Sequence, residues 1–350
     1  MLSHPVLQRE FANAATPRHL GLALSLTEQC NFRCTYCYES FEFGAMSEEI
    51  YSGLMAFATR TIPTLASFSL NWFGGEPLLE WRRMANFTRY CRTLANEHGV
   101  KMPAATVPTN AWGLTPHVLG ELVSAGIGLY MISLDGTADT HDQTRKRISG
   151  RGTFDRIYKN LLAAAQSDET FELVLRLHLH ADNIDSQRDL VQQLARDFGA
   201  DERFKLQPIA LGNFGGETVK VLNLLQRGQS DSIPLQLRNM FRPSTSIDAE
   251  ETAPPVKVCY AAKPNHIFIR PNGRLAKCTS ALDRPDNDVG HLLPTGELEM
   301  DESKALLWSF GFQTGKAADL SCPFFTKQRE QPMHFHPKPG GESQADAEPH

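Results

Sequence analysis

The sequence predicts an α/β fold in which a parallel sheet curls into a partial (β/α)6 barrel, followed by a small α+β domain that contains cysteines. Strand-like and helix-like segments alternate between residues 20 and 215 in six β-α repeats. The strands also carry one apolar and one polar face. Near residue 256 the pattern changes, because short strand-like segments and further cysteines follow a stretch rich in Ser, Thr, Glu and Pro.

Each repeat is predicted from its periodicity. Residues 20–27 alternate strictly, as a half-buried strand does, whereas the segment after Ser47 has acidic residues in its first turn, as a capped helix does. The same reasoning gives strands at 20–27, 68–73, 104–109, 128–133, 171–180 and 204–210. It gives helices at 47–60, 81–98, 116–125, 154–166 and 186–198. Successive β-α units imply parallel strands with helices outside.

The faces of the strands favour a barrel over an open sheet. Positions 171, 173, 175, 177 and 179 are Phe or Leu, while Arg176, His178 and His180 alternate with them. An open doubly wound sheet buries both faces and has continuous apolar strands, so a polar face suits a lumen that holds a ligand. Lys205 and Gln207 repeat the pattern on the next strand. We expect these five residues to face the lumen, either binding substrate or packing beside a cofactor.

Composition limits the classes of function. The chain has 350 residues, of which 41% are apolar and 21% charged, and its net charge is −5. There is no basic stripe for nucleic acid, no run of about 18 apolar residues for a membrane span, and no apolar signal-peptide core. An odd number of clustered cysteines indicates a reducing cytoplasm. We predict an extension at 1–17, the barrel at 18–215, a linker at 216–255, the cysteine-containing domain at 256–330 and a disordered tail at 331–350.

Three cysteines follow the first strand with the spacing C-x3-C-x2-C, at Cys30, Cys34 and Cys37. Three thiolates can hold three irons of a four-iron cluster and leave the fourth open to an outside ligand. A structural zinc site or buried free thiols are the alternatives. Gly74, Asn110 and Asp135 also come just after strand ends, and in β/α barrels that rim carries the active site.

The cysteine motif, with Tyr36 before its last cysteine, resembles that of radical S-adenosylmethionine (SAM) enzymes over roughly residues 18–215. The resemblance implies one [4Fe-4S] cluster at Cys30, Cys34 and Cys37, with SAM bound at the open iron and Tyr36 near the cofactor. It also implies a one-electron donor of the flavodoxin or ferredoxin type. Reductive cleavage of SAM then gives a 5′-deoxyadenosyl radical that abstracts a hydrogen atom.

The same resemblance assigns the SAM contacts. Gly74-Gly75-Glu76-Pro77 matches the family motif that receives the methionine amino group, and Asn110 lies where the family contacts the ribose. Ser133 and Arg145 match residues of the peptide- and protein-modifying branch that contact the SAM carboxylate or ribose; a planar guanidinium suits a carboxylate. Asp135 is either a ligand contact or the cap of a turn.

The C-terminal cysteines resemble a reduced SPASM or twitch domain, which carries auxiliary iron–sulfur clusters. Cys259 and Cys278 match the start of a SPASM domain, but only Cys322 follows them, whereas a full SPASM domain has seven cysteines. The resemblance therefore implies one auxiliary cluster at these three residues. His334 or His336 is conceivable as a fourth ligand or as an exposed tail residue. A zinc site built from the three cysteines and a histidine is the alternative.

Cys91 differs from the other cysteines. It repeats with Met84, Phe87 and Leu94 at helical spacing. We therefore predict a core thiol with no chemical role.

The branch that the chain resembles modifies ribosomally made peptides or matures sulfatases. Thr279 stands where sulfatase maturases have an acidic residue, which counts against sulfatase maturation. We expect oxidation or cross-linking of a precursor peptide, with the leader bound by the barrel, the C-terminal segment or a separate leader-binding protein. The alternatives are sulfatase-maturase-like oxidation, small-molecule radical chemistry, and a scaffold that binds the cluster and SAM without turnover.

Overall fold

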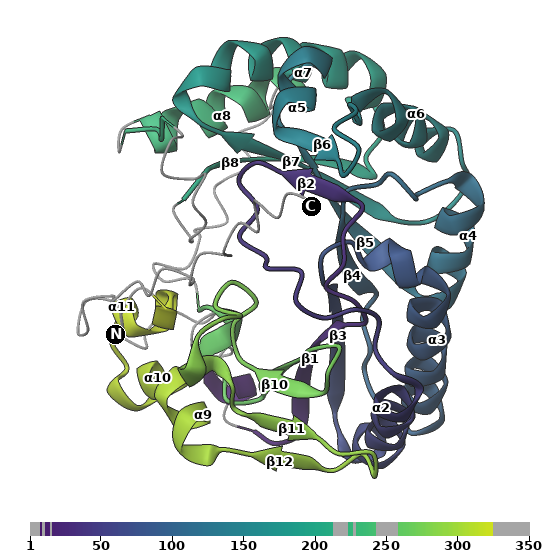
Figure 1. Cartoon of the computed structure of the whole chain (residues 1–350), viewed down its shortest axis with the longest axis vertical. Helices are drawn as coiled ribbons and strands as arrows, with labels where there is room; N and C mark the ends of the chain where they lie inside the picture. Colours follow the sequence, from purple (N-terminus) through teal and green to yellow (C-terminus); the bar gives the residue numbers. More distant parts are fainter. Residues whose placement is uncertain are drawn as a thin grey trace, which may run out of the picture.

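The computed structural model describes residues 8, 11–14, 16–212, 223–226, 229–242 and 258–324 (Figure 1). Its main sheet has the order β12-β11-β10-β9-β1-β3-β4-β5-β7-β8. The six predicted strands pair parallel to one another in this sheet, and their ends agree with the predictions to within two residues. They are β1 (His19–Ser25), β3 (Ser67–Phe73), β4 (Ala105–Thr109), β5 (Ile127–Leu134), β7 (Glu172–Leu179) and β8 (Phe204–Ala210). The predicted fold class is confirmed.

Helices cover the outer face of the curled sheet (Figure 1). Ser47 caps the first of them by accepting a hydrogen bond from the Ile50 N–H, and Thr115 caps another through the Val118 N–H. Gly126, at φ +98°, ends that second helix in the left-handed conformation. The helices are α2 (Glu48–Thr61), α3 (Trp81–Glu97), α4 (Pro116–Ala125), α6 (Phe154–Ala165) and α7 (Ile184–Phe198), with short 3-10 turns η1 (Ile62–Thr64), η2 (Pro77–Glu80) and η3 (Ala181–Asn183).

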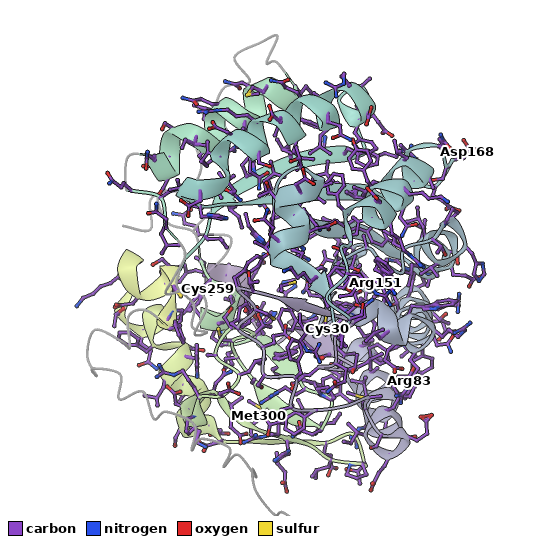
Figure 2. The ribbon with its side chains drawn as sticks, turned by 45° about the horizontal axis from the view of Figure 1, so that its top comes forward. Cys30, Arg83, Arg151, Asp168, Cys259 and Met300 are labelled. Atoms are coloured by element: carbon purple, nitrogen blue, oxygen red, sulfur yellow. The ribbon has the colours of Figure 1, made fainter. Side chains whose placement is uncertain are left out.

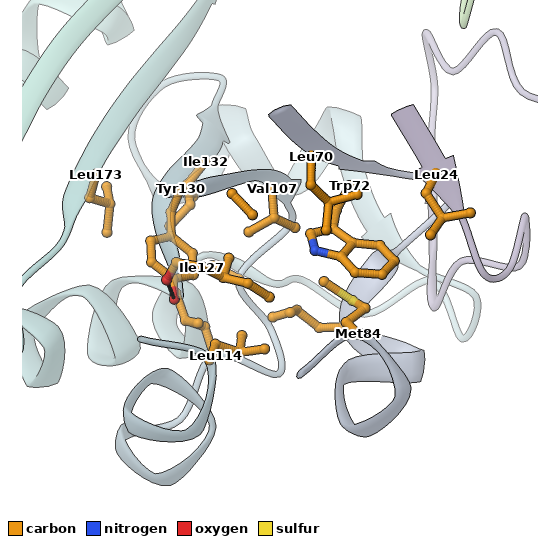
Figure 3. Close-up of a cluster of buried hydrophobic side chains, with 14 of the residues drawn as sticks. Leu24, Leu70, Trp72, Met84, Val107, Leu114, Ile127, Tyr130, Ile132 and Leu173 are labelled. Atoms are coloured by element: carbon orange, nitrogen blue, oxygen red, sulfur yellow. Dashed lines mark hydrogen bonds between the residues drawn. The ribbon is translucent and has the colours of Figure 1, made fainter. Parts of the chain in front are cut away.

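The core lies between the sheet and these helices (Figure 3). Leu24, Leu70, Trp72 and Tyr130 point from the strands toward the helices, and Met84 meets them from α3. Each such side chain contributes roughly 1.5–3 kcal/mol when fully buried. Cys91 is fully buried in this core, as its helical spacing predicted.

Two short strands that were not predicted pair outside the main sheet. β2 (Phe32–Cys34) lies within the cysteine loop and runs antiparallel to β6 (Arg145–Arg147), with Cys34 directly opposite Arg145. α5 (Ala138–Thr144) precedes β6. Strands of three residues have no period to detect, so periodicity alone could not show that Arg145 lies opposite Cys34.

The C-terminal segment continues the same sheet. β9 (His266–Ile269) pairs parallel with β1, and β10 (Arg274–Ala276), β11 (Gly290–Leu292) and β12 (Leu298–Met300) follow antiparallel. Gly273, in the turn between β9 and β10, has φ +83°. The remaining elements are η5 (Tyr260–Ala262), η6 (Pro285–Asn287), α9 (Glu302–Trp308), α10 (Phe310–Thr314) and α11 (Ala317–Ser321). The domain boundary near residue 256 stays a prediction.

A helix that was not predicted lies within the expected linker. α8 (Gln229–Phe241) packs against β8 and α7, with Ile233, Leu237 and Phe241 buried. The other parts of 216–255 lie mostly outside the described residues, as do most of 1–17 and all of the predicted tail.

Candidate functional site

A cavity of about 810 Å³ opens at the carboxyl ends of the strands and continues into the barrel. Figure 2 shows Cys30 among the side chains near the middle of the molecule. Most residues predicted to contact the cofactors line this one cavity: Cys30, Cys34, Tyr36, Cys37, Gly74, Gly75, Glu76, Asn110, Ser133 and Arg145. The segments at or after the ends of β1, β3, β4 and β5 are distant in sequence and converge here, as the strand order requires.

The two glycines of the motif after β3 pack against the cysteine loop. A Cβ on Gly74 would lie 2.2 Å from the Thr27 carbonyl oxygen, and one on Gly75 would lie 2.4 Å from that of Glu28. Gly74 also has φ +130°, which side chains rarely adopt. The Glu76 N–H donates to the Gln29 carbonyl at 3.0 Å. The glycines thus bring the segment against the loop that carries the cysteines.

Three donors fix the Glu76 carboxylate at the wall of the cavity. The Leu78 N–H (3.0 Å) and the Thr109 hydroxyl (2.6 Å) donate to Oε1, and the Asn110 N–H donates to Oε2 at 2.7 Å. Burial nevertheless raises the pKa of Glu76 above its usual value, against the effect of these hydrogen bonds. A ligand ammonium at this wall would offset the cost of burying the negative charge.

Arg145 is the centre of a buried polar network beside the cysteines. Its Nη1 donates to the Tyr36 hydroxyl at 2.7 Å, and that hydroxyl donates to Asp135 Oδ1 at 3.0 Å and lies 3.1 Å from His178 Nδ1. Burial opposes ionisation of Asp135, but the hydrogen bond with His178 and the charge of Arg145 hold the pKa of its carboxyl below the usual range. Arg145 Nε is buried without a hydrogen-bond partner among the described residues. This nitrogen is therefore available to an acceptor on a ligand.

Asp142 and His141 hold the loop between α5 and α6. Asp142 Oδ1 accepts hydrogen bonds from the backbone N–H groups of Thr153 (2.7 Å) and Phe154 (3.0 Å), and His141 Nε2 lies 3.1 Å from the Thr153 hydroxyl. These bonds fix the approach of β6 and hence of Arg145.

The three thiols have the donor chemistry of an iron–sulfur site. Burial, with the negative charge of Glu76, raises the pKa of Cys30 to about 12, and burial, with Glu39, raises that of Cys37 to about 11. Thiolates here therefore need a bound cation, and a metal centre supplies one as it displaces the protons. Among the described residues no trio of His, Cys, Asp or Glu has the spacing for a single metal ion. In a four-iron cluster each thiolate binds a different iron, so that spacing is not required.

Some predicted site residues do not line the cavity, and their roles stay predictions. Asp135 and Pro77 are buried behind the wall. Lys205 and Gln207 are exposed on β8, the edge strand among the described residues, but Gln207 Oε1 accepts a hydrogen bond from Arg176 Nε at 3.1 Å and so lies on the lumen face. His180 lies at the end of β7, where its imidazole is 3.7 Å from Asp182. Of the five lumen candidates, Arg176 and His178 line the cavity.

The structure brings Cys259, Cys278 and Cys322 together. A hydrogen bond with Cys322, followed by burial, raises the pKa of Cys259, and burial raises that of Cys278. The Cys259 N–H donates to the Leu320 carbonyl at 2.9 Å, which holds the two ends of the C-terminal segment together. Their neighbours Tyr260 and Thr279 line the cavity that also holds Cys30. His334 and His336 lie outside the described residues.

The sequence analysis did not predict three further residues in or beside the site, which are Arg270, Glu28 and Glu39. Arg270, near the end of β9, forms a buried bidentate ion pair with Glu28, just before the cysteine loop. Glu39 lines the cavity, and one of its carboxyl oxygens is shielded from solvent without a hydrogen-bond partner among the described residues. For Arg270 the available signal was a charged residue directly after a strand.

Comparison with known proteins agrees with this geometry. Residues 24–185 match the family model of the Radical SAM superfamily. GTP 3′,8-cyclase of Vibrio vulnificus is 26% identical over 155 residues, which cover 43% of this chain and 42% of the cyclase. The chain thus spans less than half the length of that curated relative. Within the described residues, no helix has the length and apolar character needed to cross a membrane.

Two solved structures share the fold. "Native anSMEcpe with bound AdoMet and Cp18Cys peptide" superposes with a TM-score of 0.56 at 17% identity, covering 84% of this chain and 82% of that one. Streptococcus suis SuiB bound to precursor peptide SuiA also gives 0.56, at 15% identity, covering 92% and 76%. The parallel curled sheet and the cysteine loop at its rim agree with the match of residues 24–185 to the radical SAM superfamily.

Proposed function

We propose that the protein is a radical SAM enzyme that oxidises or cross-links side chains of a ribosomally made precursor peptide. The observation that carries the proposal is the single cavity that joins the cysteine loop to the barrel lumen. When bound, the cluster supplies the electron that cleaves SAM to methionine and a 5′-deoxyadenosyl radical able to abstract a hydrogen atom. The electron would come from a flavodoxin- or ferredoxin-like donor.

The chain's own residues would bind and orient the cofactor. Cys30, Cys34 and Cys37 would hold the [4Fe-4S] cluster, and Glu76, already fixed by three donors, would receive the ammonium of SAM. Arg145 would use its unpartnered Nε toward the SAM carboxylate or ribose. Tyr36, Asp135 and His178 would hold that guanidinium in place.

The remaining residues that would contact SAM line the same cavity. Asn110 donates from Nδ2 to Asn31 Oδ1 at 2.7 Å and lies 3.9 Å from Cys30 Sγ, so it stands directly beside the cluster-binding loop. Ser133 lies opposite Arg176 in the pairing of β5 with β7, and both line the cavity. We assign Asn110 to the ribose and Ser133 to the carboxylate or ribose.

The first test asks whether SAM is cleaved. Anaerobically reconstituted protein should form 5′-deoxyadenosine only with SAM and a reductant present. Replacing Cys30 with Ala should abolish the product and lower the iron content, whereas Cys91→Ala, in the helix–sheet core, serves as the matched control. Iron loading without any 5′-deoxyadenosine would instead indicate a scaffold that binds the cluster.

We further propose one auxiliary iron–sulfur cluster at Cys259, Cys278 and Cys322. The proximity of these thiols and their position beside the cavity support it. A variant lacking Cys30, Cys34 and Cys37 should retain iron and sulfide. Zinc without iron in that variant would establish a zinc site and refute the auxiliary cluster.

The peptide substrate is supported by the extra length of the cavity and by the fold shared with proteins solved with bound peptides. Co-expression with a candidate precursor should lower the peptide's mass by about 2 Da for each cross-link between two C–H sites. GTP is the comparison substrate, because the sequence relatives include GTP 3′,8-cyclases. Turnover of GTP with an unmodified peptide would favour small-molecule chemistry.

A further inference from the structure

A group of cations lies on the outside of the loop that carries the cysteines. Arg33 precedes Cys34, and its side chain is exposed. In the pairing of β2 with β6 it lies directly opposite Lys146, and successive residues of a strand point to opposite faces, so both point away from the face of Cys34 and Arg145. The group, which we call the outer basic face, consists of Arg33, Lys146, Arg147, Arg151 and Arg156. None of these residues lines the cavity that would hold SAM.

Hydrogen bonds to the backbone hold the outer basic face against the cysteine loop. Arg33 Nη1 donates to the carbonyl oxygens of Cys30 and Phe32, both at 2.7 Å. The Ile148 N–H, directly after β6, donates to the Asn31 carbonyl at 3.2 Å, while the Ile148 side chain is 63% exposed. The guanidinium of Arg33 thus lies on the backbone of the loop whose thiols would bind the cluster, beside an apolar side chain that points into solvent.

The charges of the outer basic face are not balanced within the described part of the chain. No carboxylate there forms an ion pair with any of its residues. Arg33 and Lys146 stand directly opposite each other, a position in which like charges are destabilising. Asp142, on α5, accepts hydrogen bonds from two backbone N–H groups at the start of α6, so it is already used. An anionic partner would therefore relieve a repulsion that the fold leaves in place.

A half-buried tryptophan gives the outer basic face a fixed aromatic contact. The ring centre of Trp112 lies 4.6 Å from the guanidinium carbon of Arg147 and 4.5 Å from that of Arg156, and Arg156 Nε donates to the Trp112 carbonyl at 3.0 Å. The backbone N–H of Trp112 donates to Asn110 Oδ1 at 3.0 Å, and Asn110 Nδ2 lies 3.9 Å from Cys30 Sγ. Tryptophan and arginine are the residues that most often dominate the binding energy of an interface. The face thus has the composition of a docking surface, one residue away from the cluster site.

The position of the outer basic face suits a protein that delivers an electron. The proposed reaction consumes one electron for each SAM cleaved, and the face lies on the outside of the loop that would hold the cluster. A donor bound there stays outside the cavity, so SAM and substrate can remain bound while the electron passes. The whole chain has a net charge of −5, so an acidic donor would be repelled by much of the surface and attracted to this part of it.

We infer that the outer basic face is the docking surface for an acidic one-electron carrier protein. In the step that it serves, the carrier loses one electron and the cluster gains it, and no atom is transferred. The inference rests on the proposed function, because it takes Cys30, Cys34 and Cys37 to hold the cluster. It adds the place where the electron enters: at β2, β6 and the first turn of α6, and not beside the C-terminal cysteines.

Calorimetric titration of the reconstituted protein with an oxidised flavodoxin of strongly negative net charge tests the inference. At about 0.1 M salt, where charges interact over about 10 Å, Lys146→Glu should weaken binding about fivefold, a difference of roughly 1 kcal/mol. The difference should disappear near 1 M salt, where that range is about 3 Å. Lys101→Glu is the control, because it makes the same charge change at the other end of the strands, where Lys101 forms a bridge with the first residue of β3. It should leave the dissociation constant unchanged.

Stability separates a docking role from a structural one. The carboxylate that Lys146→Glu introduces would face Arg33 across the two strands, so the urea midpoint should stay the same or rise while binding of the flavodoxin weakens. A residue that served the fold alone would show the opposite pattern. If Lys146→Glu does not load iron, Arg151→Glu, in the exposed segment after β6, replaces it.

Formation of 5′-deoxyadenosine is measured on the same samples with two reductants. Dithionite is small and needs no docking surface, whereas a reduced flavodoxin must bind before it can transfer its electron. We expect the ratio of the flavodoxin-driven rate to the dithionite-driven rate to fall in Lys146→Glu by a factor similar to the loss of affinity. The ratio should not change in Lys101→Glu.

A short single-stranded RNA is titrated as the alternative polyanion. Tighter binding of the RNA than of the flavodoxin, no binding of the flavodoxin, or an unchanged dissociation constant in Lys146→Glu would overturn the inference. Absence of 5′-deoxyadenosine with dithionite argues against the proposed function but leaves the calorimetric result intact, so the two failures are distinguishable.

Discussion

Replacing Arg270 with Met tests how the C-terminal segment holds the cysteine loop. The Arg270 guanidinium donates to both carboxylate oxygens of Glu28, at 2.7 and 3.1 Å, and the two side chains are 3% and 2% exposed. It also lies 4.7 Å from the centre of the Phe43 ring and donates to the Leu282 carbonyl. Removing one member of a buried pair leaves the other charge uncompensated, at a cost of about 3–5 kcal/mol. We therefore expect the free energy of unfolding to fall by that amount.

The hairpin formed by β9 and β10 also offers a matched control. Arg274 pairs with Asp288, but those side chains are 34% and 27% exposed. Exposed pairs contribute about 0–1 kcal/mol, so Arg274→Met should be nearly neutral. The double variant Glu28→Gln with Arg270→Met should regain much of the lost stability, because no buried charge is left alone.

The assay is urea unfolding of the iron-free protein, followed by iron analysis after reconstitution. Glu28 also accepts from the Phe43 N–H at 3.3 Å, so the ion pair links both ends of the cysteine loop to β9. Arg270→Met should therefore lower iron incorporation, and Arg274→Met should not. If the free energies of unfolding of Arg270→Met and Arg274→Met differ by less than about 1 kcal/mol, the Glu28 charge is solvated in the variant. That result would refute the argument from a buried ion pair.

The other predictions concern single side chains. Gly75→Ala should lower iron incorporation, because its Cβ would meet the Glu28 carbonyl. Gly44 has open space around it, so Gly44→Ala should load iron normally. Equal iron loading in the two variants would contradict the packing argument. Burial, with repulsion by Glu28, raises the pKa of Glu39 to about 8, so the folded protein holds a proton that the unfolded chain releases above about pH 4.3. Stability of the iron-free protein should therefore decline from about pH 5 to 8, and urea midpoints of Glu39→Gln should show a smaller decline. Cys91→Ala should cost about 1 kcal/mol, like a lost buried methyl, with unchanged iron content; loss of iron would contradict a core role.

Periodicity predicted the parallel strands and their covering helices almost to the residue. These elements are long, and every second residue on the strands faces the helix-covered core. Buried positions need apolar side chains, so the sequence shows an alternating pattern. The cysteine motif could also be detected without the fold, because Cys30, Cys34 and Cys37 belong to one loop. Parallel pairing then brought Gly74, Asn110 and Ser133 to the same rim, as β/α order predicts.

Other parts of the site depend on contacts between segments far apart in the chain. Arg145 reaches the cysteines through the three-residue pairing of β2 with β6, and Arg270 meets Glu28 across 242 positions. Lys205 and Gln207 have the alternation of a lumen face, yet they are exposed because no described strand pairs with the outer edge of β8. Alternation shows which residues share a face but not what covers that face.

The sequence alone thus determined the α/β order, the cysteine motif and the rim on which it lies, since these follow from local spacing and strand direction. The tertiary structure decided which polar side chains became buried partners and which stayed exposed. It placed His266 on Gly21 and the polar network of Tyr36 around Arg145. Burial of a polar group depends on every element that packs around it. A local sequence pattern cannot predict that packing.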